Sequence, residues 1–355
     1  MHFKIQRLTK SSIQQLFSQS SKTGKLQEAI AKSAPSQDSI YLKGLTGSSL
    51  SFVLADAFIN SDAPFLLVFN DKEEAAYYLN DLEQLIGEKD VLFYPGSYRR
   101  PYQIEETDNA NVLLRAEVLN RINSRKKPAV IVTYPDALFE KVVTRKELDK
   151  NTLKIKLADT LSLDFLNEVL FEYKFKRVDF VTEPGEFSVR GGIVDVFSFS
   201  HDEPYRIEFF GDEVDSIRTF DGETQRSKDK VEKIELLPAK EFPFDSEAIS
   251  NFRNNWSEKF SGIARECPIY QDISNGILTP GLEYYFPLFF ETSNLFSYLP
   301  ESSVIINVGD IFGCSNNYWE EIEYRYEQYS GDIIKPILEP KELFIKPDEL
   351  AKLKN

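Results

Sequence analysis

Apolar and polar positions change their spacing several times along this chain, and the changes predict its elements. After polar helical segments at 12–33, short apolar runs alternate with amphipathic stretches. Such runs are typical of buried strands, and apolar positions three and four residues apart are typical of helices. Strands are predicted at 40–42, 64–69, 91–94 and 129–134, and helices at 50–59, 72–85, 111–122 and from 135 onward. Alternating strands and helices predict a parallel sheet covered by helices, over residues 1–151.

The pattern differs between residues 152 and 237. An amphipathic helix at 163–173 precedes strands rich in aromatic and β-branched residues, joined by polar turns at 201–204 and 211–212. This is typical of an antiparallel α+β domain. Helix and strand alternate again over 238–335, with a strand at 304–308, and the Pro- and Lys-containing segment 336–355 is predicted to be a linker. The expected fold class is therefore α/β, a parallel-sheet domain split by an inserted antiparallel α+β domain.

The charge balance favours a protein partner over nucleic acid. Acidic residues outnumber basic ones 57 to 42, for a net charge of −15, whereas a chain that grips a phosphate backbone usually presents a basic surface. No signal-peptide pattern and no run long enough to span a bilayer is present, so a cytoplasmic protein without membrane contact is expected.

Metal chemistry is not expected either. The chain has two cysteines, Cys267 and Cys314, and two histidines, His2 and His201. These cannot build a disulfide framework or a convincing zinc site. The cysteines are interpreted as structural thiols.

One segment has the context of a phosphate-binding loop but lacks its chemistry. The predicted strand at 40–42 leads through small residues into a helix, and the segment is Gly44, Leu45, Thr46, Gly47, Ser48, Ser49, Leu50 and Ser51. In the motif G-x-x-x-x-G-K-[ST], glycine amides cradle phosphates, lysine neutralises them and the hydroxyl holds magnesium. Gly44 and Ser51 match the first and last positions. Ser49 and Leu50 replace the second glycine and the lysine, which predicts a degenerate loop.

A second motor element is also incomplete. P-loop helicases end an apolar strand with adjacent acidic residues, whereas the strand at 304–308 is followed by Gly309 and Asp310. The two losses together predict a helicase-like P-loop fold that does not hydrolyse ATP and needs no cofactor. We therefore expect this chain not to be an enzyme.

A candidate binding face lies in the inserted domain. In the strand at 205–210, the two-residue period of a strand separates Tyr205, Ile207 and Phe209 from Arg206, Glu208 and Phe210. An aromatic residue sharing a polar face with arginine is typical of interface hot spots. Arg190 faces away from Phe187 and Val189 in the same manner, and Gly191-Gly192 predicts a bulge or a close backbone approach. Alternatively, Phe210 only covers a sheet edge while the arginines pair with local acids.

At these residues the sequence resembles a known family. Residues 177–227 resemble the UvrA-binding domain shared by UvrB and the transcription-repair coupling factors (Mfd). Residues 44–48 are similar to the start of the UvrB P-loop, and 273–290 resemble the next domain of the coupling factors. UvrB has an intact P-loop and a longer aromatic hairpin after its third strand. Leu50 and the short connection 94–109 therefore favour the coupling factors.

The resemblance implies the N-terminal, UvrB-like module of a longer protein. It divides the chain into domain 1a (1–151), the UvrA-binding domain 2 (152–237) and domain 1b (238–335). By this resemblance UvrA contacts Arg190, Arg206 and Phe210, with Arg218 a weaker candidate, and a C-terminal domain of the parent can mask this surface. It further implies that the parent meets RNA polymerase and double-stranded DNA through other domains, whose motor uses ATP and Mg²⁺.

Three other functions remain open on the sequence. An active nucleotide hydrolase would be stabilised by nucleotide. A damaged-DNA binder of the UvrB type would bind duplex DNA with a steep salt dependence. A purely structural module would have no partner and would tolerate Arg206→Ala.

Overall fold

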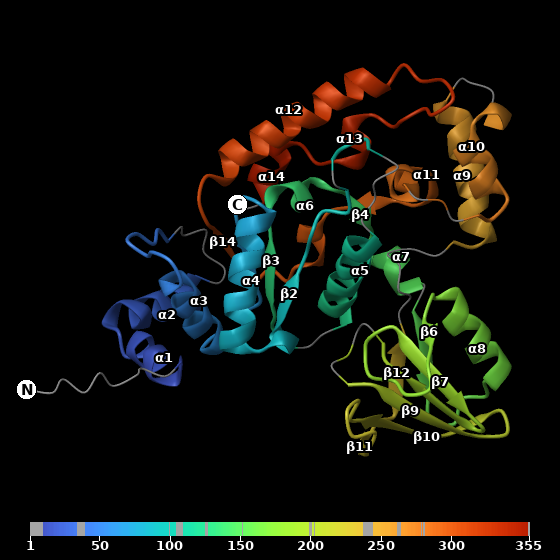
Figure 1. Ribbon diagram of the computed structural model, residues 1–355, viewed down its shortest axis with the longest axis horizontal. Helices are drawn as coiled ribbons and strands as arrows, with labels where there is room; N and C mark the ends of the chain where they lie inside the picture. The colour runs from blue at the N-terminus through green and yellow to red at the C-terminus, as the bar shows by residue number, and fades with distance from the viewer. Residues whose placement is uncertain are drawn as a thin grey trace, which may run out of the picture.

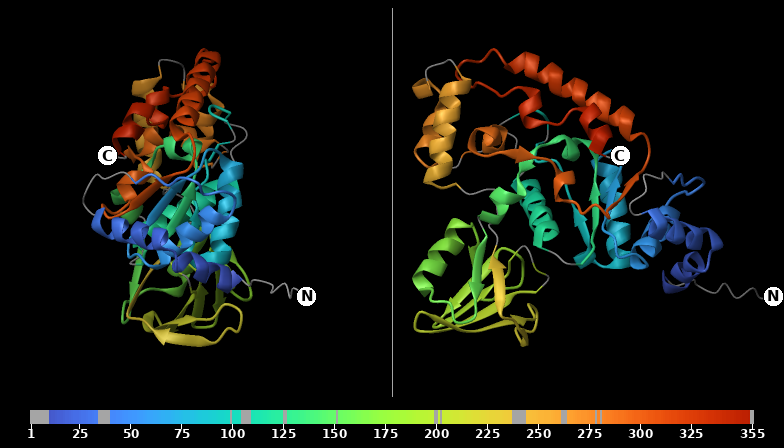
Figure 2. Two further views of the ribbon diagram at one scale, coloured as in Figure 1. Left: turned by 90° about the vertical axis from the view of Figure 1, so that its left-hand side faces the viewer. Right: turned by 180° about the vertical axis from the view of Figure 1, so that it is seen from behind.

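The computed structural model describes residues 10–33, 40–98, 100–103, 109–124, 127–150, 152–198, 201, 203–236, 244–260, 264–277, 279 and 281–353. Two large hydrophobic cores organise these residues. One core extends from Leu26 to Leu350, and the other lies between Ile155 and Leu236. The second core belongs to a smaller body, which Figures 1 and 2 show below the parallel sheet of the larger one.

A four-stranded parallel sheet forms the centre of the larger body (Figure 1). Its strand order is β14 (Val304–Asn307), β1 (Phe65–Val68), β3 (Val130–Thr133) and β2 (Val91–Phe93). Every residue of β1 and β3 is buried, as expected for central strands covered on both faces. The predicted strands at 64–69, 91–94, 129–134 and 304–308 are thus confirmed.

Helices connect and cover these strands as the apolar spacing predicts. They include α3 (Ser49–Ile59), α4 (Lys72–Ile86), α5 (Asn109–Ser124), α6 (Pro135–Phe139) and the long α12 (Ile311–Tyr329). Asp71 caps α4, because its side chain accepts a hydrogen bond from the amide of Glu74. The polar segment at the start of the chain forms α1 (Lys10–Ser18) and α2 (Ser21–Ser33), also as predicted.

The smaller body interrupts the larger one. β14 follows the inserted segment in sequence, yet it pairs in parallel with β1, with Val304 opposite Phe65. The two ends of the insertion meet in a separate antiparallel pair, β5 (Leu153–Lys156) with β12 (Lys233–Leu236). The parallel sheet is therefore completed only after the chain returns from the insertion.

The inserted body consists of a six-stranded sheet with a helix on one face. The strand order is β11 (Ser227–Lys230), β10 (Glu213–Phe220), β9 (Tyr205–Phe210), β8 (Ile193–Val196), β7 (Glu186–Arg190) and β6 (Lys176–Arg177). All neighbours are antiparallel except β6 and β7. Helix α8 (Leu163–Glu172) buries Leu166 and Leu170 in the core of this body. The predicted antiparallel α+β character is confirmed, and none of the described helices packs on the opposite face of the sheet.

The remaining elements are short or lie after the insertion. They are η1 (Glu88–Asp90), β4 (Val142–Val143), α7 (Arg145–Lys150), α9 (Ser246–Lys259), η3 (Ala264–Glu266), α10 (Pro268–Ser274), η4 (Leu282–Tyr285), α11 (Phe286–Phe289), β13 (Thr292–Ser293), η5 (Leu295–Tyr298), α13 (Pro340–Leu343) and α14 (Pro347–Leu353). None of the described helices combines the length and the apolar character needed to cross a bilayer.

Within the segment predicted to be a linker, 336–355, the described residues 336–353 instead contribute to the main core. It contains α13 and α14, and Leu343, Phe344 and Ile345 are buried. The amide of Ile345 donates to the carbonyl of Phe139, and that of Lys141 donates to Leu343. Lys341 and Lys346 are exposed while apolar residues between the prolines pack into the core, so composition alone was misleading.

The strand predicted at 40–42 is also absent from the structure. Residues 40–43 have no strand conformation, and Tyr41 is 87% exposed. The central strands β1 and β3 are paired on both edges, and residues 40–42 pair with neither of the outer strands, β14 and β2. An apolar tripeptide with no adjacent strand cannot join a sheet, because its amides and carbonyls find no partners there.

Candidate functional site

The helix-free face of the six-stranded sheet carries the side chains singled out in the sequence. Along β9, Tyr205 and Ile207 are buried against α8, whereas Arg206 and Glu208 point to the opposite face. Phe210, at the end of the strand, is 82% exposed. The predicted alternation of β9 is therefore confirmed.

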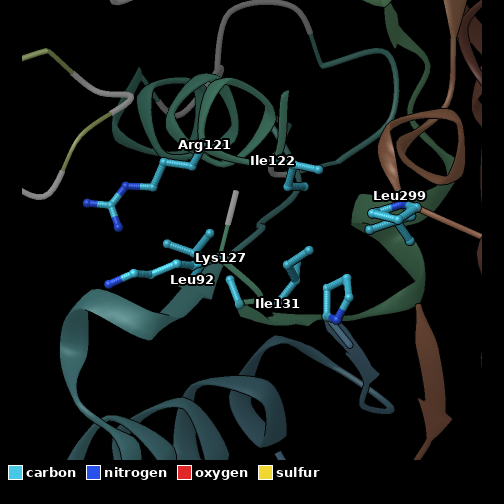
Figure 3. Close-up of a pocket in the computed structure, with 9 residues that line it drawn as sticks. Leu92, Arg121, Ile122, Lys127, Ile131 and Leu299 are labelled. Atoms are coloured by element: carbon cyan, nitrogen blue, oxygen red, sulfur yellow. The ribbon is translucent and has the colours of Figure 1, made fainter. Parts of the chain in front are cut away.

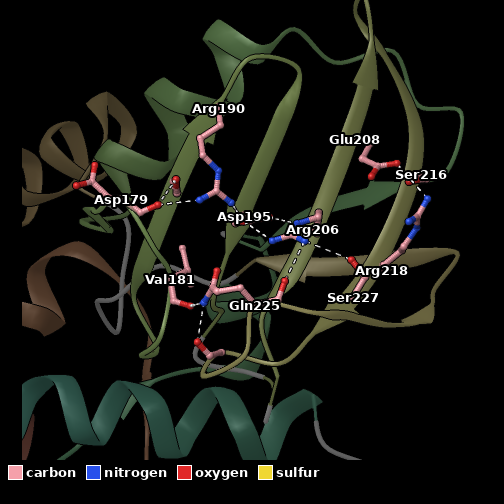
Figure 4. A network of polar contacts seen from close by, with 12 residues as sticks. Asp179, Val181, Arg190, Asp195, Arg206, Glu208, Ser216, Arg218, Gln225 and Ser227 are labelled. Carbon is pink, nitrogen blue, oxygen red and sulfur yellow. Dashed lines mark hydrogen bonds and ion pairs between the residues drawn. The ribbon is translucent and has the colours of Figure 1, made fainter.

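Two arginines on this face share one buried carboxylate (Figure 4). Asp195 on β8 lies directly opposite Arg206 on β9 and is 1% exposed. The Nε of Arg206 donates to Oδ1 of Asp195 at 2.7 Å, and its Nη2 donates to Oδ2 at 2.9 Å. Arg190 Nη2 donates to the same Oδ2. Two guanidinium groups against one carboxylate leave one positive charge without a counter-charge in this trio.

Arg206 is held inside the domain more tightly than the sequence indicates. Its side chain is 16% exposed, and its guanidinium lies 4.7 Å from the ring centre of Phe220. Its Nη1 also approaches the carbonyl of Gln225 and the hydroxyl of Ser227, both at 3.3 Å. The hydrogen bonds to Asp195 raise the pKa of Arg206 above its ordinary value. Most of its donors are therefore already used.

Arg190 is the more available of the two arginines. Its side chain is 40% exposed, and besides Asp195 it donates from Nη1 to the carbonyl of Asp179 at 2.9 Å. A guanidinium has five N–H donors, so several remain for a partner. Arg218 on β10 lies opposite Arg206 on β9 in the strand register. Its Nη2 lies 3.2 Å from Oε2 of Glu208, with which it forms an ion pair. All three arginines thus lie on one face.

The Gly191-Gly192 pair forms the turn of the β7–β8 hairpin. Arg190 pairs with Ile193, so the two glycines are the whole loop, and Gly191 has a φ of +60°. A Cβ on Gly192 would lie 3.0 Å from the carbonyl oxygen of Phe209. The predicted close approach is confirmed, whereas the alternative of a bulge is wrong. This turn holds Arg190 beside the end of β9.

One residue of this face was missed in the sequence. Phe180 is 62% exposed, and its ring centre lies 5.5 Å from the guanidinium carbon of Arg190. It belongs to a loop after β6 and follows no strand or helix period. Only the folded structure brings it beside Arg190.

The loop resembling a phosphate-binding loop is closed by its own side chains. The hydroxyl of Ser49 donates to the carbonyl of Thr46 at 2.7 Å and accepts from its amide at 2.8 Å. Ser51 is fully buried and donates to Asp81 at 2.8 Å. Leu50 packs against the main core. The hydroxyl that would hold magnesium is therefore already bound to a carboxylate.

The carboxyl edge of the parallel sheet is acidic. Asp71, Asp136 and Asp310 follow β1, β3 and β14. Burial raises the pKa of Cys314 most, and the negative charges of these three carboxylates raise it further. Burial, followed by repulsion from Glu140 and other carboxylates, raises the pKa of Asp136 to about 7. The negative charges of carboxylates at this edge disfavour the binding of a triphosphate.

A small pocket lies at the other end of the same sheet (Figure 3). Leu92, Ile131 and Leu299 are among the residues that line it, and Pro64 and Ala129 immediately precede β1 and β3. Ligands of open α/β sheets bind at the carboxyl ends of strands, whereas this pocket lies at the amino ends of β1 and β3. Cys267 and Cys314 form no disulfide, and among the described residues no group of histidine, cysteine or acidic side chains could hold a metal ion.

Comparison with known proteins gives a consistent family. The family model described as "UvrB interaction domain" matches residues 153–242, which include the whole described part of the insertion. The transcription-repair-coupling factor of Haemophilus influenzae is 34% identical over 286 residues, which are 80% of this chain and 25% of that protein. The transcription-repair-coupling factor of Escherichia coli is 32% identical over 314 residues, or 88% of this chain and 27% of that protein.

The chain thus spans about a quarter of the length of the curated relatives it matches. The matches cover both the parallel-sheet body and the insertion, since 88% of the chain exceeds what either body contains. Over 80–88% of its length the chain is thus similar to transcription-repair-coupling factors, and its residues 153–242 match the UvrB interaction domain.

Proposed function

We propose that this chain serves transcription-coupled DNA repair as a docking module that binds UvrA through the helix-free face of the inserted sheet. The names of its relatives support a role in transcription-coupled repair, and the family model over 153–242 supports a protein-binding role for the insertion. The observation that carries the proposal is the pairing of an 82% exposed Phe210 with the arginine cluster on one sheet face.

This face has the physical properties of a protein-binding surface. An exposed phenylalanine gains hydrophobic stabilisation only when a partner covers it. Asp195 neutralises one of the two guanidinium groups bound to it, so an acidic partner would complete the charge balance. The chain as a whole carries −15, so this local positive charge directs such a partner to one place.

In this proposal the chain does not hydrolyse ATP. Leu50 occupies the lysine position, Ser51 donates to Asp81, and the carboxyl edge of the sheet is acidic. Displacement of RNA polymerase on double-stranded DNA, driven by ATP and Mg²⁺, would then belong to other parts of a full-length relative. A C-terminal domain of such a protein would control access to the docking face.

Calorimetric titration of UvrA into the chain tests the proposal. Phe210→Ala is the informative variant because its exposed ring has no role in the core. We expect its Kd to rise roughly tenfold or more, the usual effect of removing an aromatic hot spot. Phe165→Ala is the matched control, since Phe165 is 47% exposed on α8, on the opposite side of the sheet.

Binding by the wild-type chain and the Phe165 control, with loss in the Phe210 variant, would support the proposal. No binding by the wild-type chain would overturn it, as would an equal loss in both variants. Thermal melts of each variant establish that the fold is intact. Titration of duplex DNA in parallel tests the UvrB-type alternative.

A further inference from the structure

Phe180 is an exposed aromatic residue held in a fixed position. Its neighbour Val181 is fully buried in a small core with Phe197 and Phe220. The side-chain amide of Gln225 donates to the carbonyl of Val181 at 3.0 Å. The backbone around Phe180 is thus fixed although its ring is 62% exposed, so a partner would meet a preorganised ring.

Arg190 links this ring to the arginine cluster. Its guanidinium contacts the Phe180 ring and donates to both the carbonyl of Asp179 and the carboxylate of Asp195. A cation close to an aromatic ring is attracted to it, and covering the pair with a partner strengthens the attraction by removing water. Phe180 and Arg190 therefore present one joint surface.

The two exposed rings come from different segments of the chain that both reach the arginine cluster. Phe180, in the loop between β6 and β7, lies beside Arg190 at the end of β7, and Phe210 lies at the end of β9. At about 3.3 Å per residue, Phe210 is about 13 Å along the strand from Arg206. Because strands β7, β8 and β9 are adjacent, the whole arrangement fits one continuous footprint.

We infer that Phe180 is a second aromatic anchor of the docking face, and that the UvrA segment bound there carries a carboxylate between two apolar side chains. This inference rests on the proposed function. The carboxylate complements the surplus positive charge of the trio Arg190, Asp195 and Arg206, and the apolar side chains cover the two rings.

Titration of UvrA into the Phe180→Ala and Phe180→Leu variants tests the inference. We expect Phe180→Ala to raise the Kd roughly fivefold to tenfold, and Phe180→Leu to raise it less because the apolar contact is partly kept. Phe165→Ala again serves as the exposed-phenylalanine control. In the Phe180→Ala/Phe210→Ala double variant the two losses should multiply, because the rings do not touch.

The outcomes separate this inference from the proposed function. Wild-type affinity in Phe180→Ala, together with loss in Phe210→Ala, would overturn the second anchor alone. No binding of UvrA by the wild-type chain would overturn the proposed function and with it this inference.

Salt titration tests the carboxylate inferred on the UvrA segment. Arg190→Ala should flatten the dependence of Kd on salt, and an unchanged slope would contradict a charged contact at Arg190.

Discussion

Asp195 shows how one buried residue determines the chemistry of a surface. Its carboxylate, 1% exposed, fixes the orientation of Arg206 and restrains Arg190. Removing Arg206 would leave that carboxylate with one cationic partner fewer in a buried place, which is costly. A loss of binding in Arg206→Ala would therefore combine a changed surface with a weakened domain. Arg190→Ala and Phe210→Ala report on the surface more directly.

Asp136 makes the stability of the larger body depend on pH. Its pKa is about 7, against 3.8 for an unperturbed aspartate, mainly because of burial and the nearby Glu140. The raised pKa means that its protonated form stabilises the fold below about pH 4, and that this contribution is lost as the pH rises through about 7. Asp136→Asn should therefore gain stability relative to wild type between pH 5 and pH 8, by about 1 kcal/mol or more.

Urea unfolding of both proteins at the two pH values measures this effect. Asp164→Asn is the matched control, because Asp164 is exposed in the first turn of α8 whereas Asp136 is in the first turn of α6. A difference between wild type and Asp136→Asn that stays constant with pH would contradict the prediction.

At the scale of elements, the loop before α3 is a place where we expect that restoring a sequence motif does not create a phosphate site. The Ser49→Gly/Leu50→Lys variant has the complete sequence motif from Gly44 to Ser51. We still expect no stabilisation by Mg-ATP, because the Ser51 hydroxyl is buried and donates to Asp81, and because the described residues just before the loop, 40–43, form no strand. Thermal melts with and without Mg-ATP measure this. A rise in Tm with nucleotide would show that the loop retains a phosphate site.

The strand β9 shows the opposite case, an element whose sequence pattern determines its surface. Its alternation places Tyr205 and Ile207 in the core and Arg206 on the open face without help from distant residues. The long-range contribution is Asp195, which the β8–β9 register brings opposite Arg206. The face therefore depends on both the local period and the pairing.

At the scale of the whole molecule, the C-terminal segment packs into the core of the larger body. Phe344 is 1% exposed, and its ring lies near those of Tyr98 and Tyr102. Phe344→Ala should lower the free energy of unfolding by about 3–5 kcal/mol, as for other buried phenylalanines. Ile333→Ala is the control, since Ile333 is 74% exposed and should cost under about 0.5 kcal/mol. Equal, small losses in urea unfolding would mean that the segment is a linker after all.

Much of the fold could be predicted because its signals are local. The apolar runs of β1 and β3, the helical spacing of α4 and the two-residue period of β9 each depend on neighbours within one element. Part of the candidate face followed from the same period, since Arg206 and Phe210 share one side of a strand. The predictions for residues 40–42 and for the described residues 336–353 were wrong, because an apolar tripeptide and a Pro- and Lys-containing tail do not reveal whether a partner surface exists.

The sequence by itself determined the strand and helix alternation, the change to antiparallel strands in the insertion and the polar face of β9. Only the tertiary structure decided that β14 joins β1, that Phe344 belongs to the core, that Asp195 holds two arginines and that Phe180 lies beside one of them. The physical reason is range. Backbone periodicity acts between near neighbours, whereas charge pairing and burial depend on which distant segments the folded chain brings into contact.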